Sequence, residues 1–519
     1  MVPSLQASPK FVDGDVERYW DQIPQWREIS TKDFNSYSWQ LRETITKDYK
    51  LHRFLSQALP ETIGSSKDIL LQHIKTKEKF MEDALAAFKL APMAIRLTPH
   101  ILSRVDWSNP LDDPIRKQFI PLASSIIPDN DNLKLDSLEE EKDSPVPGLV
   151  HRYPGRALFL ATSICPVYCR FCTRSYAIGA PTESVAKKPQ KPSRGRWEKM
   201  FEYIESRPDL KDIVLSGGDA YYLLPEQLLE IGNRLLNMDN IRRIRIASKG
   251  LSVAPCRIKP GDPWTEALIA VAKKGRKMGK QVSLHTHINH AREITWATKA
   301  AMSYLFEHGV IVRNQSVLLK GVNDQPEDMM ELLNKIADIN ITPYYVYQCD
   351  LVKGIEDLRT PLKVAMELEK KIRGTISGFN MPNFVVDLPG GGGKRLVSTA
   401  ESYDETAGVA IYKTPGLTGI KSTTKYFYHD PKPMTNTEII ALRDQKMRQR
   451  KLERSQPVGE EATEAKSDCG YPTPKPAVKP NVERDERNSP DVQPGISYGW
   501  LPNGTQNHPP VSAYAFAPQ

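Results

Sequence analysis

The stretch Ala157-Leu-Phe-Leu-Ala-Thr-Ser-Ile-Cys165-Pro-Val-Tyr-Cys169-Arg-Phe-Cys172 marks the point at which the chain changes character. Its first five residues are apolar, as in a buried strand, and three cysteines follow within eight residues. From here onward, short apolar runs alternate with amphipathic helical patterns. This alternation predicts a parallel sheet, either open or closed into a barrel.

Working outward, the alternation can be followed to about residue 390. Strands are predicted at residues 157–161, 212–215, 241–247, 281–284, 310–318, 341–347 and 383–386. Helices are predicted between them, at residues 197–206, 225–237, 263–278, 294–307, 326–338 and 361–373. Repeated strand–helix units ending on a last strand favour a partial or full barrel over a Rossmann-type open sheet. We therefore predict an α/β fold, a partial (β/α)6-type barrel of parallel strands.

The rest of the 519-residue chain differs in composition. Residues 1–150 read as a helical N-terminal region, and the acidic run 136–142 within it as solvated. Residues 151–400 hold the barrel, and residues 401–455 form an extension with a charged helix from about 437 to 454. Residues 456–519 contain 11 of the 41 prolines and little apolar periodicity, which predicts a disordered tail. The basic insertion 182–196 is predicted to be a mobile surface loop.

Composition excludes several classes of protein. Six cysteines in 519 residues rule out a disulfide scaffold. No apolar run approaches the ~20 residues of a membrane span, and acidic residues near the N-terminus argue against a transit peptide. A net charge of +8 on this length does not indicate nucleic-acid binding. The expectation is a soluble cytoplasmic protein with neither membrane nor nucleic-acid partners.

The strongest chemical signal is the group Cys165, Cys169 and Cys172. A structural zinc site would need a fourth protein ligand, whereas a [4Fe–4S] cluster held by three thiolates leaves one iron open. Three unliganded cysteines on a turn are the simpler alternative. This spacing after a strand resembles the radical S-adenosylmethionine (SAM) superfamily. The resemblance implies that SAM binds the open iron, and that an electron donor reduces the cluster to give a 5′-deoxyadenosyl radical.

A second signal is Ser216-Gly217-Gly218-Asp219, at the end of the second predicted strand. Its glycines allow a close approach of the backbone to a ligand, and its carboxylate can meet an ammonium. A plain turn is the alternative. In this position, the motif resembles the superfamily's glycine-rich motif for the amino group of SAM. His287 and Gln315 match further positions that contact SAM in the family that the remaining motifs indicate.

A third signal is Asp387-Leu-Pro-Gly390-Gly-Gly-Gly-Lys394. This could be a flexible linker, a phosphate-wrapping loop, or a pliable loop that carries a lysine for Schiff-base chemistry. Its glycine spacing is not that of a Walker A motif. Upstream, Arg152 and Arg156 are natural partners of a phosphate, although surface arginines are the simpler interpretation.

Together these motifs resemble the lysine 2,3-aminomutase family, from about residue 33 to about residue 400. The resemblance implies that Lys394 forms a Schiff base with pyridoxal 5′-phosphate (PLP), and that Arg152, Tyr153 and Arg156 hold this cofactor. It also implies that Arg174 binds the substrate α-carboxylate. The implied activity is that of an isomerase that moves the α-amino group of L-lysine to C3, giving β-lysine.

Two aspartates bear on the substrate. Asp350 follows the sixth predicted strand, and Asp387 ends the seventh. Both matching positions are Asp in the lysine enzymes and bind the distal ammonium, whereas the related glutamate enzymes do not carry two carboxylates there. Two carboxylates complement an ammonium and repel a side-chain carboxylate. The sequence therefore favours lysine, with two exposed strand-end aspartates as the alternative.

The candidate residues share a placement. The cysteines, Asp219, His287, Gln315, both aspartates and Lys394 all fall in the late parts of predicted strands or just beyond them. Active sites of barrel enzymes lie at the carboxyl ends of the strands. We therefore expect these residues to converge on one site.

The chain also departs from the family. The bacterial lysine enzymes of the family carry a C-terminal cysteine cluster that helps form an intersubunit zinc site. In this chain the tail contains only Cys469, and Gln325 stands where a further zinc-ligating cysteine would be. We therefore predict no such zinc site and leave a homo-oligomer open. Ser175 and Tyr176 follow Arg174 where the family often has arginines. Two alternatives remain: an aminomutase for another cationic amino acid such as arginine, and a noncatalytic Fe–S regulatory protein.

Overall fold

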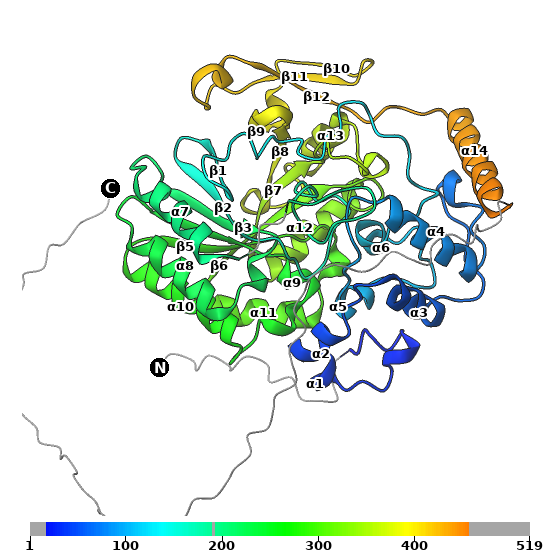
Figure 1. Cartoon of the computed structure of the whole chain (residues 1–519), viewed down its shortest axis with the longest axis horizontal. Helices are drawn as coiled ribbons and strands as arrows, with labels where there is room; N and C mark the ends of the chain where they lie inside the picture. Colours follow the sequence, from blue (N-terminus) through cyan, green and yellow to red (C-terminus); the bar gives the residue numbers. More distant parts are fainter. Residues whose placement is uncertain (1–16, 189–191, 456–519) are drawn as a thin grey trace, which may run out of the picture. The chain divides into compact units, whose positions relative to one another are not determined.

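Nine strands lie side by side in chain order and curve into most of a barrel (Figure 1). The computed structural model describes residues 17–188 and 192–455. The parallel strands are β2 (Arg156–Thr162), β3 (Asp212–Gly217), β4 (Arg243–Ala247), β5 (Gln281–Thr286), β6 (Ile311–Leu318), β7 (Ile341–Gln348) and β8 (Asn383–Leu388). All seven predicted strands are thus present, within two residues of their expected ends.

Antiparallel strands that the sequence pattern did not reveal close both edges of the sheet. They are β1 (Leu149–Tyr153), which pairs with β2, and β9 (Gly393–Leu396), which pairs with β8. Both are short, and the pairing of β1 is interrupted by a register shift. Neither therefore shows the longer apolar run that identified the parallel strands.

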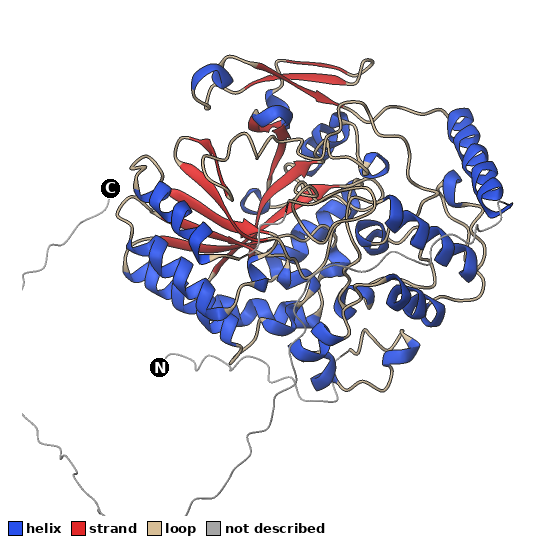
Figure 2. Ribbon diagram, viewed as in Figure 1, coloured by secondary structure: helices blue, strands red, loops and turns tan. Residues whose placement is uncertain are grey.

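Helices cover the outer face of the parallel strands (Figure 2). They are α7 (Arg194–Glu205), α8 (Pro225–Asn237), α10 (Pro263–Lys277), α11 (Trp296–Glu307), α12 (Pro326–Asp338) and α13 (Leu362–Ile372), and the short α9 (Gly250–Val253) follows β4. All six predicted helices are confirmed. Successive residues of a strand point to opposite faces, so Ile213 and Leu215 of β3 enter the core while Val214 and Ser216 line the interior.

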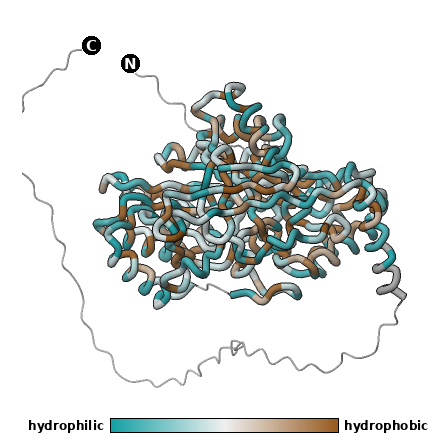
Figure 3. Tube along the Cα trace, turned by 90° about the horizontal axis from the view of Figure 1, so that it is seen from above, coloured by the Kyte–Doolittle hydropathy of each residue, from teal (hydrophilic) through white to brown (hydrophobic). Residues whose placement is uncertain are grey.

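The N-terminal region is helical, as predicted. It contains α1 (Thr31–Phe34), α2 (Tyr37–Arg42), α3 (Asp48–Ala58), α4 (Lys77–Leu90), α5 (Pro99–Leu102) and α6 (Pro114–Phe119). Its aromatic residues, such as Trp20 stacked on Phe34 at 4.2 Å, belong to the same hydrophobic core as the barrel. Figure 3 shows hydrophobic segments, in brown, in the interior of the folded part of the chain.

The C-terminal extension holds a second, antiparallel sheet that the sequence did not predict. Its strands are β10 (Ser402–Asp404), β11 (Val409–Lys413) and β12 (Lys425–His429). The predicted charged helix is confirmed as α14 (Asn436–Ser455). Its Lys446 donates hydrogen bonds to the carbonyls of Ala123 and Ser124, at 3.2 and 3.4 Å, so α14 is attached to the N-terminal region.

Two predicted loops are less exposed than expected. The run 136–142 is not simply solvated, because Glu140 is buried. Val185 and Lys187 of the basic insertion are also buried, and α7 already begins at Arg194. Residues 189–191 of the insertion and the predicted tail with Cys469 lie outside the described residues. Among the described helices, none is both long and apolar enough to cross a membrane.

Candidate active site

A cavity of about 380 Å³ lies at the carboxyl ends of the parallel strands. Every site residue predicted from the sequence lines it. These residues are Arg152, Tyr153, Arg156, Cys165, Cys169, Cys172, Arg174, Gly217, Gly218, Asp219, His287, Gln315, Asp350, Asp387 and Lys394. Elements far apart in the chain therefore bring the predicted residues to one place.

The three cysteines lie on the loop that follows β2, and none forms a disulfide. Burial raises the pKa of the Cys169 thiol to about 12, so a bound metal is needed to hold this group as a thiolate. The thiolates of an iron–sulfur cluster bind different irons and need not meet at one point. Within the described ranges, no three Cys, His, Asp or Glu side chains surround a single-ion position.

Arg170, between two of the cysteines, anchors this loop. Its guanidinium donates two hydrogen bonds to the Asp357 carboxylate, at 2.8 and 2.9 Å, and one to the carbonyl of Lys117 at 3.1 Å. Arg170 is buried, so these contacts fix the loop against both the N-terminal region and the segment after β7. The motif search missed this anchor because its partners are remote in sequence.

The Gly217–Gly218 pair lets β3 end directly against the cysteine loop. Gly217 has a φ of 122°, and a Cβ there would lie 2.2 Å from the Thr162 carbonyl oxygen. A Cβ on Gly218 would lie 2.4 Å from the Ile164 carbonyl oxygen. No side chain fits either position, so the close approach requires both glycines.

Asp219 is buried next to this turn. Its carboxylate accepts hydrogen bonds from the backbone amides of Tyr221 and Lys249, at 2.8 and 2.7 Å. Burial raises the pKa of Asp219 to about 6, so the group is mostly ionised at neutral pH. The carboxylate thus links the ends of β3 and β4 at the cavity wall.

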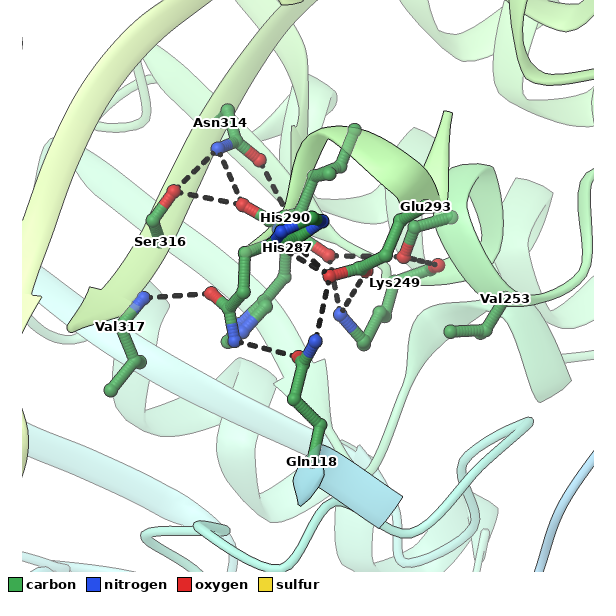
Figure 4. Close-up of polar contacts among 12 residues, drawn as sticks. Gln118, Lys249, Val253, His287, His290, Glu293, Asn314, Ser316 and Val317 are labelled. Carbon is green, nitrogen blue, oxygen red and sulfur yellow. Dashed lines mark hydrogen bonds and ion pairs between the residues drawn. The ribbon is translucent and has the colours of Figure 1, made fainter. Parts of the chain in front are cut away.

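A buried polar network supports the turn after β5 (Figure 4). Glu293 accepts hydrogen bonds from Lys249 Nζ at 3.0 Å and from Gln118 Nε2 at 3.2 Å. Lys249 Nζ also donates to the backbone carbonyl of His287 at 2.7 Å. The Lys249–Glu293 pair therefore holds a predicted SAM-contacting residue in place. Sequence reasoning missed this pair, whose two members stand in separate loops without a recognisable spacing.

His287 itself faces the cavity as a neutral imidazole. Its ring stacks on Phe171 of the cysteine loop, with centroids 5.6 Å apart. Burial holds the pKa of His287 well below its usual range. Gln315 accepts a hydrogen bond from the Tyr347 hydroxyl at 2.8 Å, and its amide nitrogen lies 3.3 Å from Nδ1 of His285.

Lys394 lies on β9 rather than on the pliable loop predicted from the glycines. It is directly opposite Asp387 of β8, and its ammonium contacts that carboxylate. Burial alone would lower the pKa of Lys394, but the Asp387 carboxylate together with Tyr347 and Tyr153 outweighs burial and raises it. In the same way, burial would raise the pKa of Asp387, but Lys394 and Arg152 hold it below its usual range.

The aromatic and cationic residues of β1 and β2 stand beside this pair. The backbone amide of Lys394 donates to the Tyr153 hydroxyl at 2.8 Å, and the Arg156 guanidinium lies 3.8 Å from the centre of the Tyr153 ring. Arg152 donates through Nε to Asp143 at 2.7 Å, and its Nη1 lies 3.8 Å from Asp387. Two guanidinium groups, a phenol and a lysine thus share one wall of the cavity.

Asp350 lies just beyond β7 and is partly buried. Its Oδ2 accepts a hydrogen bond from the Thr173 hydroxyl at 2.6 Å. Burial and the nearby Asp387 carboxylate raise the pKa of Asp350 to about 7. The group therefore sits close to its titration point at neutral pH, and a cationic ligand would favour its ionised form.

Arg174 makes a contact that the sequence did not indicate. Its guanidinium donates two hydrogen bonds, each of 2.7 Å, to the carboxylate of Glu140. Glu140 belongs to the run 136–142 that the sequence predicts to be solvated, and Asp143, the partner of Arg152, directly follows that run. An acidic run in a loop has no periodicity to show which of its members point inward, so only the structure reveals their role.

Several polar atoms of the cavity have no hydrogen-bond partner among the described residues. They are Oγ1 of Thr286, Oε1 of Gln348, Nε2 of His285 and His287, and Oδ1 of Asp350 and Asp387. Buried polar groups are normally hydrogen-bonded, so unpaired atoms that face a cavity indicate a polar ligand. The two carboxylate oxygens favour a ligand that is cationic at one end.

Comparison with known proteins agrees with this geometry. A family model described as the radical SAM superfamily matches residues 159–333, and such a domain implies a [4Fe–4S] cluster and SAM. The L-lysine 2,3-aminomutase of Clostridium subterminale is 38% identical over 372 residues, covering 72% of this chain and 80% of that protein. The L-lysine 2,3-aminomutase of Bacillus subtilis is 35% identical over 379 residues, covering 73% and 72%.

A relative named for another substrate is less similar. The glutamate 2,3-aminomutase of Clostridioides difficile is 28% identical over 378 residues, covering 72% of this chain and 80% of that protein. The two lysine enzymes are 38% and 35% identical to this chain over most of their length, which shows membership of one family. With the cysteine loop and the cavity described above, the chain therefore belongs to the lysine 2,3-aminomutase family within the radical SAM superfamily.

Proposed function

We propose that the protein is an isomerase that converts L-lysine to β-lysine with a [4Fe–4S] cluster, SAM and PLP. The observation that carries this proposal is the meeting of Asp350 and Asp387 with Lys394 in the cavity that the three cysteines also line. A lysine side chain ends in an ammonium, and Asp350 offers it an oxygen with no hydrogen-bond partner. A glutamate side chain would be repelled there.

The residues present suit both sets of cofactors. Cys165, Cys169 and Cys172 would hold three irons of the cluster, and Asp219 with the Gly217–Gly218 turn would receive the amino group of SAM. Arg152 and Arg156 line the same cavity as Lys394 and would be partners for a phosphate, and Tyr153 would offer its ring and hydroxyl. When bound, the cluster and SAM supply a radical that removes a hydrogen atom, and PLP supplies a π-bonded link to the migrating nitrogen.

The chain's own groups position the substrate. Arg174 binds the α-carboxylate, and Asp350 holds the distal ammonium at its free oxygen. These contacts at both ends of the amino acid fix the carbon from which hydrogen is taken. Neutral His287 stacks on Phe171 of the cysteine loop, Gln315 lines the same cavity, and we assign both residues to SAM.

Asp387 changes partners in this scheme. It is paired with the Lys394 ammonium, whose pKa it raises, so Lys394 must first lose a proton before its amine can act. Lys394 would hold PLP through its side-chain nitrogen, and its ammonium would then no longer neutralise Asp387. That carboxylate is then available to the distal ammonium of the substrate, together with Asp350.

A substrate comparison tests the proposal. The protein would be purified without oxygen, its cluster reconstituted, and SAM, PLP and dithionite added with L-lysine, L-arginine or L-glutamate in separate reactions. We expect a 3-amino product from lysine with the highest kcat/KM of the three. A higher kcat/KM for arginine would show that the cavity serves another cationic amino acid. Conversion of glutamate in preference to lysine would overturn the charge argument.

A further inference from the structure

We propose that Glu140 is a positioning residue for Arg174, which it turns so that a substrate carboxylate meets only the end of the guanidinium. This inference rests on the proposed function for the role of Arg174. It adds a specificity determinant in residues 136–142, outside the motifs on which the resemblance to the family rests. Its basis is a buried ion pair whose geometry uses one edge of the arginine and leaves the other edge to the cavity.

The pair is bidentate and largely shielded from water. Arg174 Nε donates to Glu140 Oε2 and Arg174 Nη2 to Glu140 Oε1, each at 2.7 Å. The Tyr176 hydroxyl donates to Glu140 Oε2 at 3.1 Å. The side chain of Glu140 is 5% exposed and that of Arg174 is 22% exposed. Glu140 is thus saturated by its partners, whereas Arg174 still opens to the cavity.

A guanidinium has two edges that can bind a carboxylate with two parallel hydrogen bonds. Glu140 occupies the edge formed by Nε and Nη2. The edge formed by Nη1 and Nη2 is not used by this contact, and Arg174 lines the cavity. A ligand carboxylate can therefore approach end-on, and the plane of the guanidinium that it meets is set by Glu140.

The backbone around Glu140 is itself fixed. The Asp136 carboxylate accepts hydrogen bonds from the amides of Glu140 and Glu141, at 3.0 and 3.1 Å. The Ser144 hydroxyl donates to the carbonyl of Glu140 at 2.7 Å. The carboxylate is therefore presented from a constrained turn and resists rotation when a second carboxylate binds Arg174.

The pair also sets the local charge. Glu140 neutralises Arg174 before a ligand arrives, so this partly exposed arginine is not left as an uncompensated cation. Without Glu140, Arg174 would be free to turn toward other acceptors, and its hold on one carboxylate would lose direction. Loss of Glu140 should therefore weaken the binding of ligands that carry an α-carboxylate and leave the binding of ligands that lack it unchanged.

The test compares two ligands in the loaded holoenzyme. L-lysine and its decarboxylated counterpart cadaverine share the distal ammonium and differ in the carboxylate. Equilibrium dialysis would give the Kd of each for wild type, Glu140→Gln and the control Glu141→Gln. Glu141 is the next residue, 46% exposed and paired with Lys188, so it matches the change without touching Arg174.

We expect Glu140→Gln to raise the Kd for L-lysine at least about tenfold, because a charge-assisted pair is lost. The Kd for cadaverine should stay as in wild type, and Glu141→Gln should leave both unchanged. In turnover, KM for lysine should rise more than kcat falls. An equal loss for both ligands, or no loss for lysine, would overturn the proposal. Should Glu140→Gln fail to fold, Tyr176→Phe must show the same selective effect at smaller size.

Failure of the proposed function would be seen separately. Absence of β-lysine from loaded wild type concerns the reaction, whereas the dialysis comparison needs only binding. If wild type prefers another cationic amino acid, the same comparison applies to that amino acid and its own decarboxylated amine. With either amino acid and its amine, a Glu140→Gln variant that binds the amino acid more weakly but the amine equally well supports the inference. A variant that keeps the wild-type preference for the amino acid overturns the inference.

Discussion

Asp350 is the residue at which burial most directly affects substrate binding. Burial and the Asp387 carboxylate raise its pKa to about 7, so the group is protonated in a growing fraction of molecules as the pH falls. Only the ionised form attracts an ammonium. Binding of a cationic substrate is therefore expected to weaken on the acid side of neutrality.

The corresponding prediction concerns kcat/KM for L-lysine between pH 6 and pH 8. Below the pKa of Asp350, kcat/KM should fall by roughly tenfold per pH unit, because the free enzyme must lose a proton to bind the ammonium. Asp350→Asn should lower kcat/KM throughout and remove this dependence. The same fall near pH 7 in Asp350→Asn would assign the titration to another group.

Among single residues, the sequence reveals those that belong to recognisable motifs. It does not reveal the residues that hold the motif residues in place. Cys165, Lys394 and their neighbours stand in patterns whose chemistry is readable. Glu140 and Glu293 are single acidic residues in loops, and nothing local distinguishes them from solvated ones. Their importance comes from long-range partners, Arg174 and Lys249, which only the folded chain brings together.

Among the elements, the end of β3 depends most strictly on its sequence. Gly217→Ala would place a methyl group 2.2 Å from a backbone oxygen, at a φ that L-residues avoid. We expect a loss of about 1–3 kcal/mol in the free energy of unfolding, as for other overpacked sites. The midpoint of urea denaturation measures this loss, and SAM affinity should fall with it.

Gly195→Ala is the matched control for this change. A Cβ at Gly195 meets nothing within 4 Å, and this residue lies in α7, where alanine is at least as favourable. Its denaturation midpoint should equal or slightly exceed that of wild type. Equal midpoints for Gly217→Ala and Gly195→Ala would contradict the close packing of β3 against the cysteine loop.

Strand and helix positions in the barrel were predictable because two periodicities alternate there and proline opens several helices. The edge strands β1 and β9 and the small sheet β10–β12 were not predictable from these signals. They are three to five residues long, and parts of them face solvent, so their sequences carry too weak a strand signal. Their stability comes from pairing with strands already in place.

For the whole molecule, the candidate site depends on the compact unit that ends at Ser455. Every predicted site residue lies within it. A chain ending at residue 455 is therefore expected to retain the kcat of the full chain, as measured under the same reconstitution. A clear loss of kcat, with cluster content unchanged, would show that residues 456–519 contribute to the reaction.

A shorter chain ending at residue 400 provides the contrast. It would lose Lys421, whose ammonium contacts Asp143, the carboxylate that binds Arg152. It would also remove Tyr428, whose buried hydroxyl donates to the Cys349 carbonyl at 2.8 Å. We expect this chain to bind PLP poorly or to aggregate, which absorbance of the cofactor and size-exclusion chromatography would reveal.

The central claim is that the cavity moves the α-amino group of L-lysine to C3. The most direct test supplies L-lysine labelled with ¹⁵N at the α-amino group to the loaded protein and follows the label by NMR. We expect β-lysine with ¹⁵N on C3, and no product from Lys394→Ala, which should retain the absorbance of the iron–sulfur cluster but lose that of lysine-linked PLP. Unchanged lysine with a fully loaded wild type, or product from Lys394→Ala, would contradict it.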